Sequence, residues 1–190
     1  MTPTATAPAG LPVQYSPDYH ALADLFPTLP VGELVASPTA DDVPEPYRSL
    51  LVHTHHMTVT VEQFYGGPVD VRVLDSVRDG DEYARSILLV HRESGRVVQS
   101  GVVRIDLSLL APKVREEILA EDTPLGRVLI QNNVLRRVQP TGYLCVALSA
   151  ELATAFGCDI GQEAYGRLGV IYTDGKPAIQ VLEVLAPVLG

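Results

Sequence analysis

Alternation of apolar and polar residues in the middle of the chain constrains its fold more than any other feature of the sequence. In residues 69–77 the valines at alternate positions share one face of an expected strand, while Asp70 and Arg72 lie on the other. Tight turns at Asp79-Gly80 and Ser94-Gly95 then lead into strands at residues 82–90 and 96–105. Three consecutive strands joined by such turns predict an antiparallel meander.

The rest of the chain supplies helices and further strands. Residues 133–148 predict one or two strands, and a final hairpin around Asp174-Gly175 joins residues 167–173 to residues 176–185. Helices are expected at residues 16–26, 44–51, 57–65, 112–120 and 150–156 and from Pro124 onward, with a long connection at residues 27–42. The sequence therefore predicts an α+β fold, in which helices pack on a single antiparallel sheet of about six strands.

Length and charge narrow the class of protein. The 190 residues are enough for one domain with a sizeable core, and we expect a loose tail at residues 1–16 and a single domain at residues 17–190. The net charge of −9 argues against a nucleic-acid partner, which would need a basic face. The chain has no apolar run of membrane-spanning length and no secretory signal pattern at its start, so we expect no membrane partner and a cytoplasmic location. Cys145 and Cys158 are expected to be free thiols.

Residues 123–127, Thr-Pro-Leu-Gly-Arg, predict the start of a short helix. Thr123 is a suitable N-cap, and proline is favoured at the first helical position that Pro124 would occupy. The free N–H groups of a helix start suit a carboxylate or phosphate, and Gly126 would let a ligand approach the backbone closely.

Arg85 lies in a strand that is apolar on both faces. A guanidinium in such a place needs a partner, and its planar fork suits a carboxylate. The alternative is an arginine near the end of the strand whose head reaches solvent. The sequence leaves both interpretations open.

Glu183 lies in a second strand with apolar residues on both faces. A buried carboxylate is costly unless it is paired or stays protonated, and a protonated glutamate is what a general acid requires. An internal ion pair between Arg85 and Glu183, with no substrate involved, would explain both residues equally well.

His53, His55 and His56 raise the possibility of a metal site. The chain offers no matching Cys, His or Asp pair at a typical distance, so a polar junction between two helices is the better interpretation. The sequence also lacks a phosphate-binding glycine loop and a CxxC motif.

Taken together, several motifs of this chain resemble the chorismate–pyruvate lyase family, particularly its actinobacterial branch. The matching stretches are residues 50–53 with 56–58, 85–89, 101–105, 123–127 and 183–187, in the order of the family. The resemblance implies a fold with a single antiparallel sheet of six strands. It also implies a carbon–oxygen lyase that eliminates pyruvate from chorismate to leave 4-hydroxybenzoate, without a cofactor, in an enclosed pocket.

The resemblance also assigns roles to residues. Arg85 would bind a substrate carboxylate, and Glu183 would act as proton donor or hydrogen-bond partner. The backbone at Leu125 and Gly126 would hold the carboxylate, and Met57 and Thr58 would form part of a lid. The interval from Lys176-Pro177 to Glu183 is one residue longer than in the enterobacterial branch, so Glu183 would face away from the pocket unless a bulge restores it.

Two other functions fit the same residues. The fold also serves as the ligand-sensing domain of bacterial transcription regulators, which bind a small acid without turnover. A related enzyme of secondary metabolism, catalysing another elimination or a cyclisation, is also compatible, since a fold does not fix its function. All three hypotheses have a small organic acid as the partner, and none specifies an oligomeric state.

Overall fold

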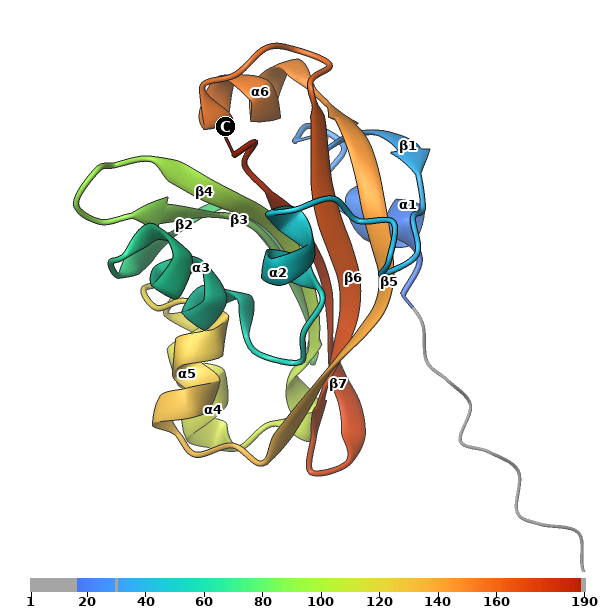
Figure 1. Ribbon diagram of the computed structural model, residues 1–190. Coiled ribbons are helices and arrows are strands. Elements are labelled where there is room, and N and C mark those ends of the chain that lie inside the picture. The colour runs from blue at the N-terminus through green and yellow to red at the C-terminus, as the bar shows by residue number, and fades with distance from the viewer. Residues whose placement is uncertain (1–16, 30, 189–190) are drawn as a thin grey trace, which may run out of the picture.

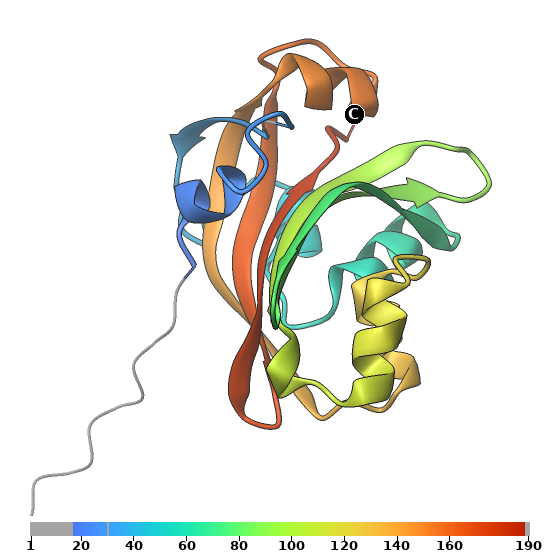
Figure 2. The same ribbon diagram turned by 180° about the vertical axis from the view of Figure 1, so that it is seen from behind.

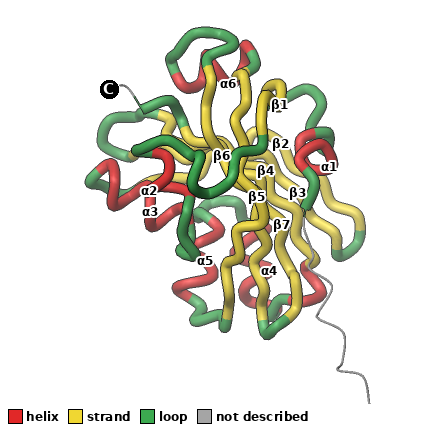
Figure 3. The backbone as a smooth tube through the Cα atoms, turned by 45° about the vertical axis from the view of Figure 1, so that its right-hand side comes forward, coloured by secondary structure: helices red, strands yellow, loops and turns green. Residues whose placement is uncertain are grey.

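The computed structural model describes residues 17–29 and 31–188, so the expected tail at residues 1–16 lies outside the described residues. Seven antiparallel strands form one continuous sheet in the order β1-β5-β6-β7-β4-β3-β2. Figure 3 shows the strands in yellow and the helices in red. The strands are β1 (Gly32–Ala36), β2 (Val69–Asp79), β3 (Glu82–His91), β4 (Val97–Asp106), β5 (Arg136–Leu148), β6 (Glu163–Thr173) and β7 (Lys176–Leu185). The helices are α1 (Tyr19–Ala23), α2 (Tyr47–Leu51), α3 (Met57–Tyr65), α4 (Pro112–Leu119), α5 (Leu125–Gln131) and α6 (Ala150–Phe156), with a 3-10 turn η1 (Leu107–Leu109).

The predicted α+β architecture is confirmed, with one strand more than expected. The meander β2–β3–β4 and the hairpin β6–β7 lie where the alternation and the turn residues place them. The interpretation of residues 27–42 as a connection is wrong, because β1 pairs with β5 at the edge of the sheet. This strand has only five residues, and most of its side chains are at least partly exposed, so it carries no clear alternation.

Helices cover both faces of the sheet. Figure 1 shows α2, α3, α4 and α5 on one side, which we call the front face, and Figure 2 shows α1 against the opposite side. On this back face α1 and α6 share one apolar cluster with residues of β3 to β7, including Leu22, Phe156, Leu88 and Val184. The sheet is therefore a central layer, which explains why β3 and β7 are apolar on both faces.

The front face carries two separate apolar clusters. One gathers around α4 and α5 and includes Ile118, Leu129 and Ile179, and the other gathers around α2 and α3 and includes Leu51, Val61 and Leu185. Cross-strand pairing places Ile87, Gly101, Glu183 and Arg167 in one row across the sheet, and Arg85 in the next row. Since directly paired residues share a face, the sheet brings these polar groups to the front.

The additional residue before Glu183 is accommodated by a bulge. Tyr172 pairs with Pro177 and the preceding Ile171 pairs with Ile179, so Ala178 is the extra residue of β7. One such bulge restores the alternation beyond it. Glu183 therefore lies on the front face, as the resemblance requires.

The start of α5 differs from the sequence prediction in its detail. The helix begins at Leu125, and Pro124 is its N-cap, with extended backbone angles of φ −54° and ψ 135° and no side-chain capping bond. Thr123 is therefore not the cap, and Pro124 is not the first helical residue. The prediction was wrong by one position, because an extended proline delays the first helical turn by one residue.

Candidate functional site

A small cavity separates the front face of the sheet from the starts of α3 and α5. Its volume is about 50 Å³. The lining residues include all six of the predicted site residues, namely Arg85, Glu183, Met57, Thr58, Leu125 and Gly126. The sheet supplies the two charged residues and the helices supply the other four, so segments far apart in the sequence converge on one space. We call it the inner cavity.

Arg85 is the most unusual residue of the inner cavity. Its side chain is almost completely buried, with an exposed fraction of 1%, so the alternative of a solvent-reaching arginine is wrong. Its Nη1 donates a long hydrogen bond of 3.4 Å to the carbonyl oxygen of Ile118, while Nε has no partner among the described residues. Burial lowers the pKa of Arg85. A buried donor without an acceptor costs about 1–3 kcal/mol, which a ligand with a suitable oxygen would recover.

Tyr83 and Glu121 interact electrostatically with Arg85. The hydroxyl of Tyr83 donates a hydrogen bond of 2.5 Å to Oε1 of Glu121. Burial, and then the bond to Glu121, raise the pKa of Tyr83 to about 12. None of the ion pairs in the described part of the chain includes Arg85.

Glu183 is paired, but with a different arginine from the one expected. Nε of Arg167 donates a hydrogen bond of 2.7 Å to its Oε2, and the exposed fractions of these side chains are 2% and 14%. The hypothesis of an internal Arg85–Glu183 ion pair is therefore wrong. In its contact with Arg167, Oε2 of Glu183 acts as a hydrogen-bond acceptor, and a role of Glu183 as proton donor stays a prediction.

Arg167 also fixes the connection between α2 and α3. Its Nη1 donates to the carbonyl oxygens of Leu51 and His53, at 3.2 and 3.1 Å, and its Nη2 donates to that of His55 at 3.2 Å. The sequence analysis missed this role. The available signal was an arginine inside an otherwise apolar strand, which is the argument that singled out Arg85.

Of the three histidines, His53 forms the polar junction between two helices that the sequence predicts. Nε2 of His53 lies 2.7 Å from the carbonyl oxygen of Leu50 in α2 and 3.0 Å from the hydroxyl of Thr60 in α3. Burial, and then Arg167, lower the pKa of His53 to about 4. Among the described residues no group of three or more His, Cys, Asp or Glu side chains could hold a metal ion.

The starts of α3 and α5 meet at Gly126. A Cβ atom on Gly126 would lie 3.0 Å from both Cβ of His56 and Oγ1 of Thr58. The ion pair between Arg127 and Glu62 joins the two helices, and Glu62 also accepts a hydrogen bond of 2.9 Å from the backbone of Val69. Gly126 therefore allows close packing of the two helices, and its contact with a ligand stays a prediction.

Gln99 is a second polar residue of the inner cavity that sequence reasoning missed. Its exposed fraction is 3%, and its Oε1 has no hydrogen-bond partner among the described residues. With Nε of Arg85, the cavity thus contains one buried donor and one buried acceptor that are both unsatisfied. Alternation alone gives no reason to select Gln99, because a glutamine is common on an exposed strand face.

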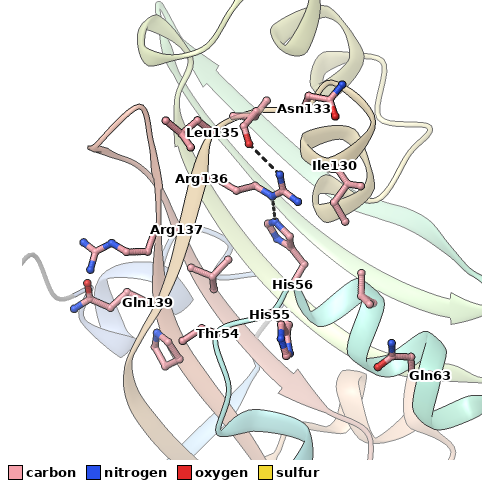
Figure 4. A pocket seen from close by; sticks show the side chains of 14 residues that line it. Thr54, His55, His56, Gln63, Ile130, Asn133, Leu135, Arg136, Arg137 and Gln139 are labelled. Atoms are coloured by element: carbon pink, nitrogen blue, oxygen red, sulfur yellow. Dashed lines mark hydrogen bonds between the residues drawn. The ribbon is translucent and has the colours of Figure 1, made fainter.

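A larger groove lies outside the inner cavity, between the start of α3, the end of α5 and the first residues of β5. Its volume is about 1140 Å³, and Figure 4 shows the side chains that line it. His56 lines both spaces. Nε of Arg136 donates a hydrogen bond of 2.6 Å to Nε2 of His56, as the dashed line in Figure 4 marks. Burial, and then Arg136 and Arg167, lower the pKa of His56 to about 4, so its ring is neutral at pH 7.

Comparison with known proteins identifies the fold. No family model matches the sequence, and no curated protein matches it. Among solved structures, PhnF from Mycobacterium smegmatis is similar, with a TM-score of 0.55 and 13% identity over 86% of this chain and 93% of that chain. The effector domain of PhnF gives a TM-score of 0.53 and 14% identity over 70% and 88% of the two chains. A third similar structure is the ligand-binding domain of a protein from Bordetella bronchiseptica that is assigned to the GntR family of transcriptional regulators. Its TM-score is 0.46, with 17% identity over 62% of this chain and 84% of that chain.

At these identities the likeness concerns the fold alone. The expected chorismate lyase-like fold is confirmed, while no comparison bears on lyase activity. No helix in the described part of the chain combines the length and apolar character needed to cross a bilayer. The absence of nucleic-acid and membrane partners and the cytoplasmic location stay predictions.

Proposed function

We propose that this protein binds a small organic acid in the inner cavity, with Arg85 as the receptor of its carboxylate. The observation that carries this proposal is the buried guanidinium of Arg85, whose Nε has no hydrogen-bond partner and which forms no ion pair within residues 17–29 and 31–188. A carboxylate would accept two hydrogen bonds from such a group and would remove the cost of its burial. Oε1 of Gln99 offers an acceptor for a hydroxyl of the same ligand.

The small volume of the inner cavity means that the protein must change shape to admit an organic acid. A volume of about 50 Å³ has room for a few water molecules, whereas pockets for small organic ligands usually measure about 300–1,000 Å³. The sheet is the rigid wall, so α3 or α5 must move when the acid enters. A protein that closes in this way over its ligand suits both a sensor and an enzyme.

The experiment that tests this proposal is calorimetric titration with 4-hydroxybenzoate. We expect saturable binding that Arg85→Ala weakens at least 30-fold and Arg85→Lys weakens less, because lysine keeps the charge but loses the planar fork. The matched control is Arg104→Ala, since Arg104 is exposed and paired with Glu82 at 3.0 Å. Equal affinity in the wild-type protein and in Arg85→Ala would refute the proposal.

A second candidate function is elimination of pyruvate from chorismate. The observation in its favour is that Arg85, Glu183 and the segment Leu125-Gly126 line one cavity, as the resemblance to the lyase family requires. The reaction breaks the bond between the ring carbon and the ether oxygen, and the ring carbon that bears the hydroxyl loses a proton. The methylene carbon of the enolpyruvyl group gains a proton, so that the group leaves as pyruvate, and aromatisation of the ring drives the reaction. Arg85 would hold the ring carboxylate, and Glu183, kept as an acceptor by Arg167, would hold a ring hydroxyl.

Incubation with chorismate separates the two candidates. Formation of equal amounts of pyruvate and 4-hydroxybenzoate would establish the lyase, and saturable binding without either product would reject the lyase. The same incubation addresses a related enzyme on this scaffold, because chorismate would then be left intact.

A further inference from the structure

The larger groove outside the inner cavity, which we call the outer groove, is lined by basic residues although the whole chain has a net negative charge. The sequence contains 23 acidic and 14 basic residues, yet none of the described residues that line the groove is Asp or Glu. Arginine, histidine and amide side chains provide its polar lining, and Val59, Ile130 and Leu135 provide apolar lining. A groove of this kind suits an anion with an apolar body.

Arg136 is the basic group that points into this groove. Figure 4 shows its guanidinium directed toward His56, whereas that of Arg137 points the other way. Nη1 of Arg136 donates a hydrogen bond of 2.9 Å to the carbonyl oxygen of Val134. None of the ion pairs among the described residues includes Arg136, and its Nη2 has no hydrogen-bond partner there. Within the described part of the chain, the hydrogen-bond partners of this half-buried charge are a neutral imidazole and a carbonyl oxygen.

The position of His56 connects the groove to the inner cavity. Its exposed fraction is 8%, and it forms part of the wall of both spaces. Because a guanidinium nitrogen can only donate, Nε2 of His56 accepts the hydrogen bond from Arg136. This bond holds the ring in the wall between the two spaces.

We propose that the outer groove is a second binding site for an organic carboxylate, held by Arg136, from which the ligand passes His56 into the inner cavity. This inference rests on the proposed function of the inner cavity. A carboxylate would bind the edge formed by Nε and Nη2 of Arg136, and it is a stronger acceptor than a neutral imidazole. It would therefore displace His56 from Nε of Arg136. The released ring could then swing away and open the wall between the outer groove and the inner cavity, which must move before a ligand can enter.

Fluorine NMR with 4-fluorobenzoate tests this proposal on the full chain. We expect two bound environments in the wild-type protein. Arg136→Gln should weaken the outer one at least tenfold, and Arg85→Ala should abolish the inner one while leaving the outer affinity within twofold. The control Arg104→Gln, which removes an equal charge outside both spaces, should keep both environments. Should Arg136→Gln fail to fold, Arg136→Lys is expected to weaken the outer environment at least threefold.

The exchange rate tests the passage past His56. His56→Ala should speed dissociation of the inner ligand at least tenfold and should not weaken outer binding, because it removes the ring that competes with the carboxylate for Nε of Arg136. The second site would be refuted if only one bound environment is seen and its affinity falls in Arg85→Ala but not in Arg136→Gln. The proposed function would then still stand. A single bound environment whose affinity falls in Arg136→Gln but not in Arg85→Ala would instead refute the proposed function. An unchanged dissociation rate of the inner ligand in His56→Ala would refute the passage past His56.

Discussion

Arg167 and Glu183 form a buried ion pair on neighbouring strands, and the same guanidinium holds the backbone between α2 and α3. The pair therefore links the candidate acidic residue of the inner cavity to the segment that leads into α3. Arg85 lies two strands from Glu183 and takes part in none of the ion pairs that the described residues form. One arginine thus has a structural role, and the other stays available for a ligand.

Replacing Arg167 with methionine should destabilise the protein strongly. The variant leaves Glu183 unpaired and the three backbone carbonyls without their donor, and removal of one partner of a buried pair typically costs about 3–5 kcal/mol. The free energy of unfolding from urea denaturation measures the effect. Arg104→Met is the matched control, because its pair with Glu82 is exposed and should contribute less than about 1 kcal/mol. A similar loss in both variants would contradict the structural role of Arg167.

Glu183→Gln should cost less stability than Arg167→Met. Glutamine keeps an oxygen that can accept from Arg167, so we expect a loss of about 1–2 kcal/mol in the free energy of unfolding. If the chain is a chorismate lyase, the same variant should lower kcat at least tenfold, because the neutral amide is a weaker acceptor for the ring hydroxyl. An unchanged kcat in an active enzyme would remove Glu183 from the reaction.

Gly126→Ala tests the contact between α3 and α5. Alanine is favoured over glycine inside a helix by about 1 kcal/mol, yet its Cβ would lie only 3.0 Å from His56 and Thr58. Both neighbours are close to the backbone and have little freedom to move, so we expect a net loss of about 1 kcal/mol, measured by thermal unfolding. Gly142→Ala is the control, since its Cβ would meet no atom within 4 Å. A stabilised Gly126→Ala would show that the two helices are loosely packed.

Acidification should destabilise the protein through His53 and His56. The pKa of each falls from an ordinary value of 6.5 to about 4 in the folded chain, chiefly through burial. Between these values the unfolded chain binds protons that the folded chain does not. The free energy of unfolding should therefore be unaffected by these groups above pH 6.5 and should fall as the pH drops toward 4. Imidazole proton shifts in NMR check the cause directly, and midpoints near 6.5 for both residues would contradict it.

The fold could be predicted from the sequence where local patterns are strong. Alternation and turn glycines identify the meander, and α3 begins and ends at Met57 and Tyr65 as expected. The edge strand β1 escaped notice because it is stabilised by pairing with β5, at a distance in the sequence of more than 100 residues. Such pairing leaves little trace in a five-residue segment.

The candidate site could be predicted in its members but not in its pairing. An arginine and a glutamate in apolar strands are conspicuous, and both line the inner cavity. Which arginine meets Glu183 depends on the register of β6 against β7 and on the bulge at Ala178. His56 and Arg136 are 80 residues apart, so their hydrogen bond follows from the packing of α3 against the start of β5 and from no local motif.

Arg167 contacts the segment after α2 through carbonyl oxygens at every second position, Leu51, His53 and His55, rather than through side chains alone. Main-chain oxygens are the same whichever amino acid carries them. Substitutions in that segment could therefore change its side chains, including His55 in the lining of the outer groove, while the hydrogen bonds from Arg167 to its backbone are kept.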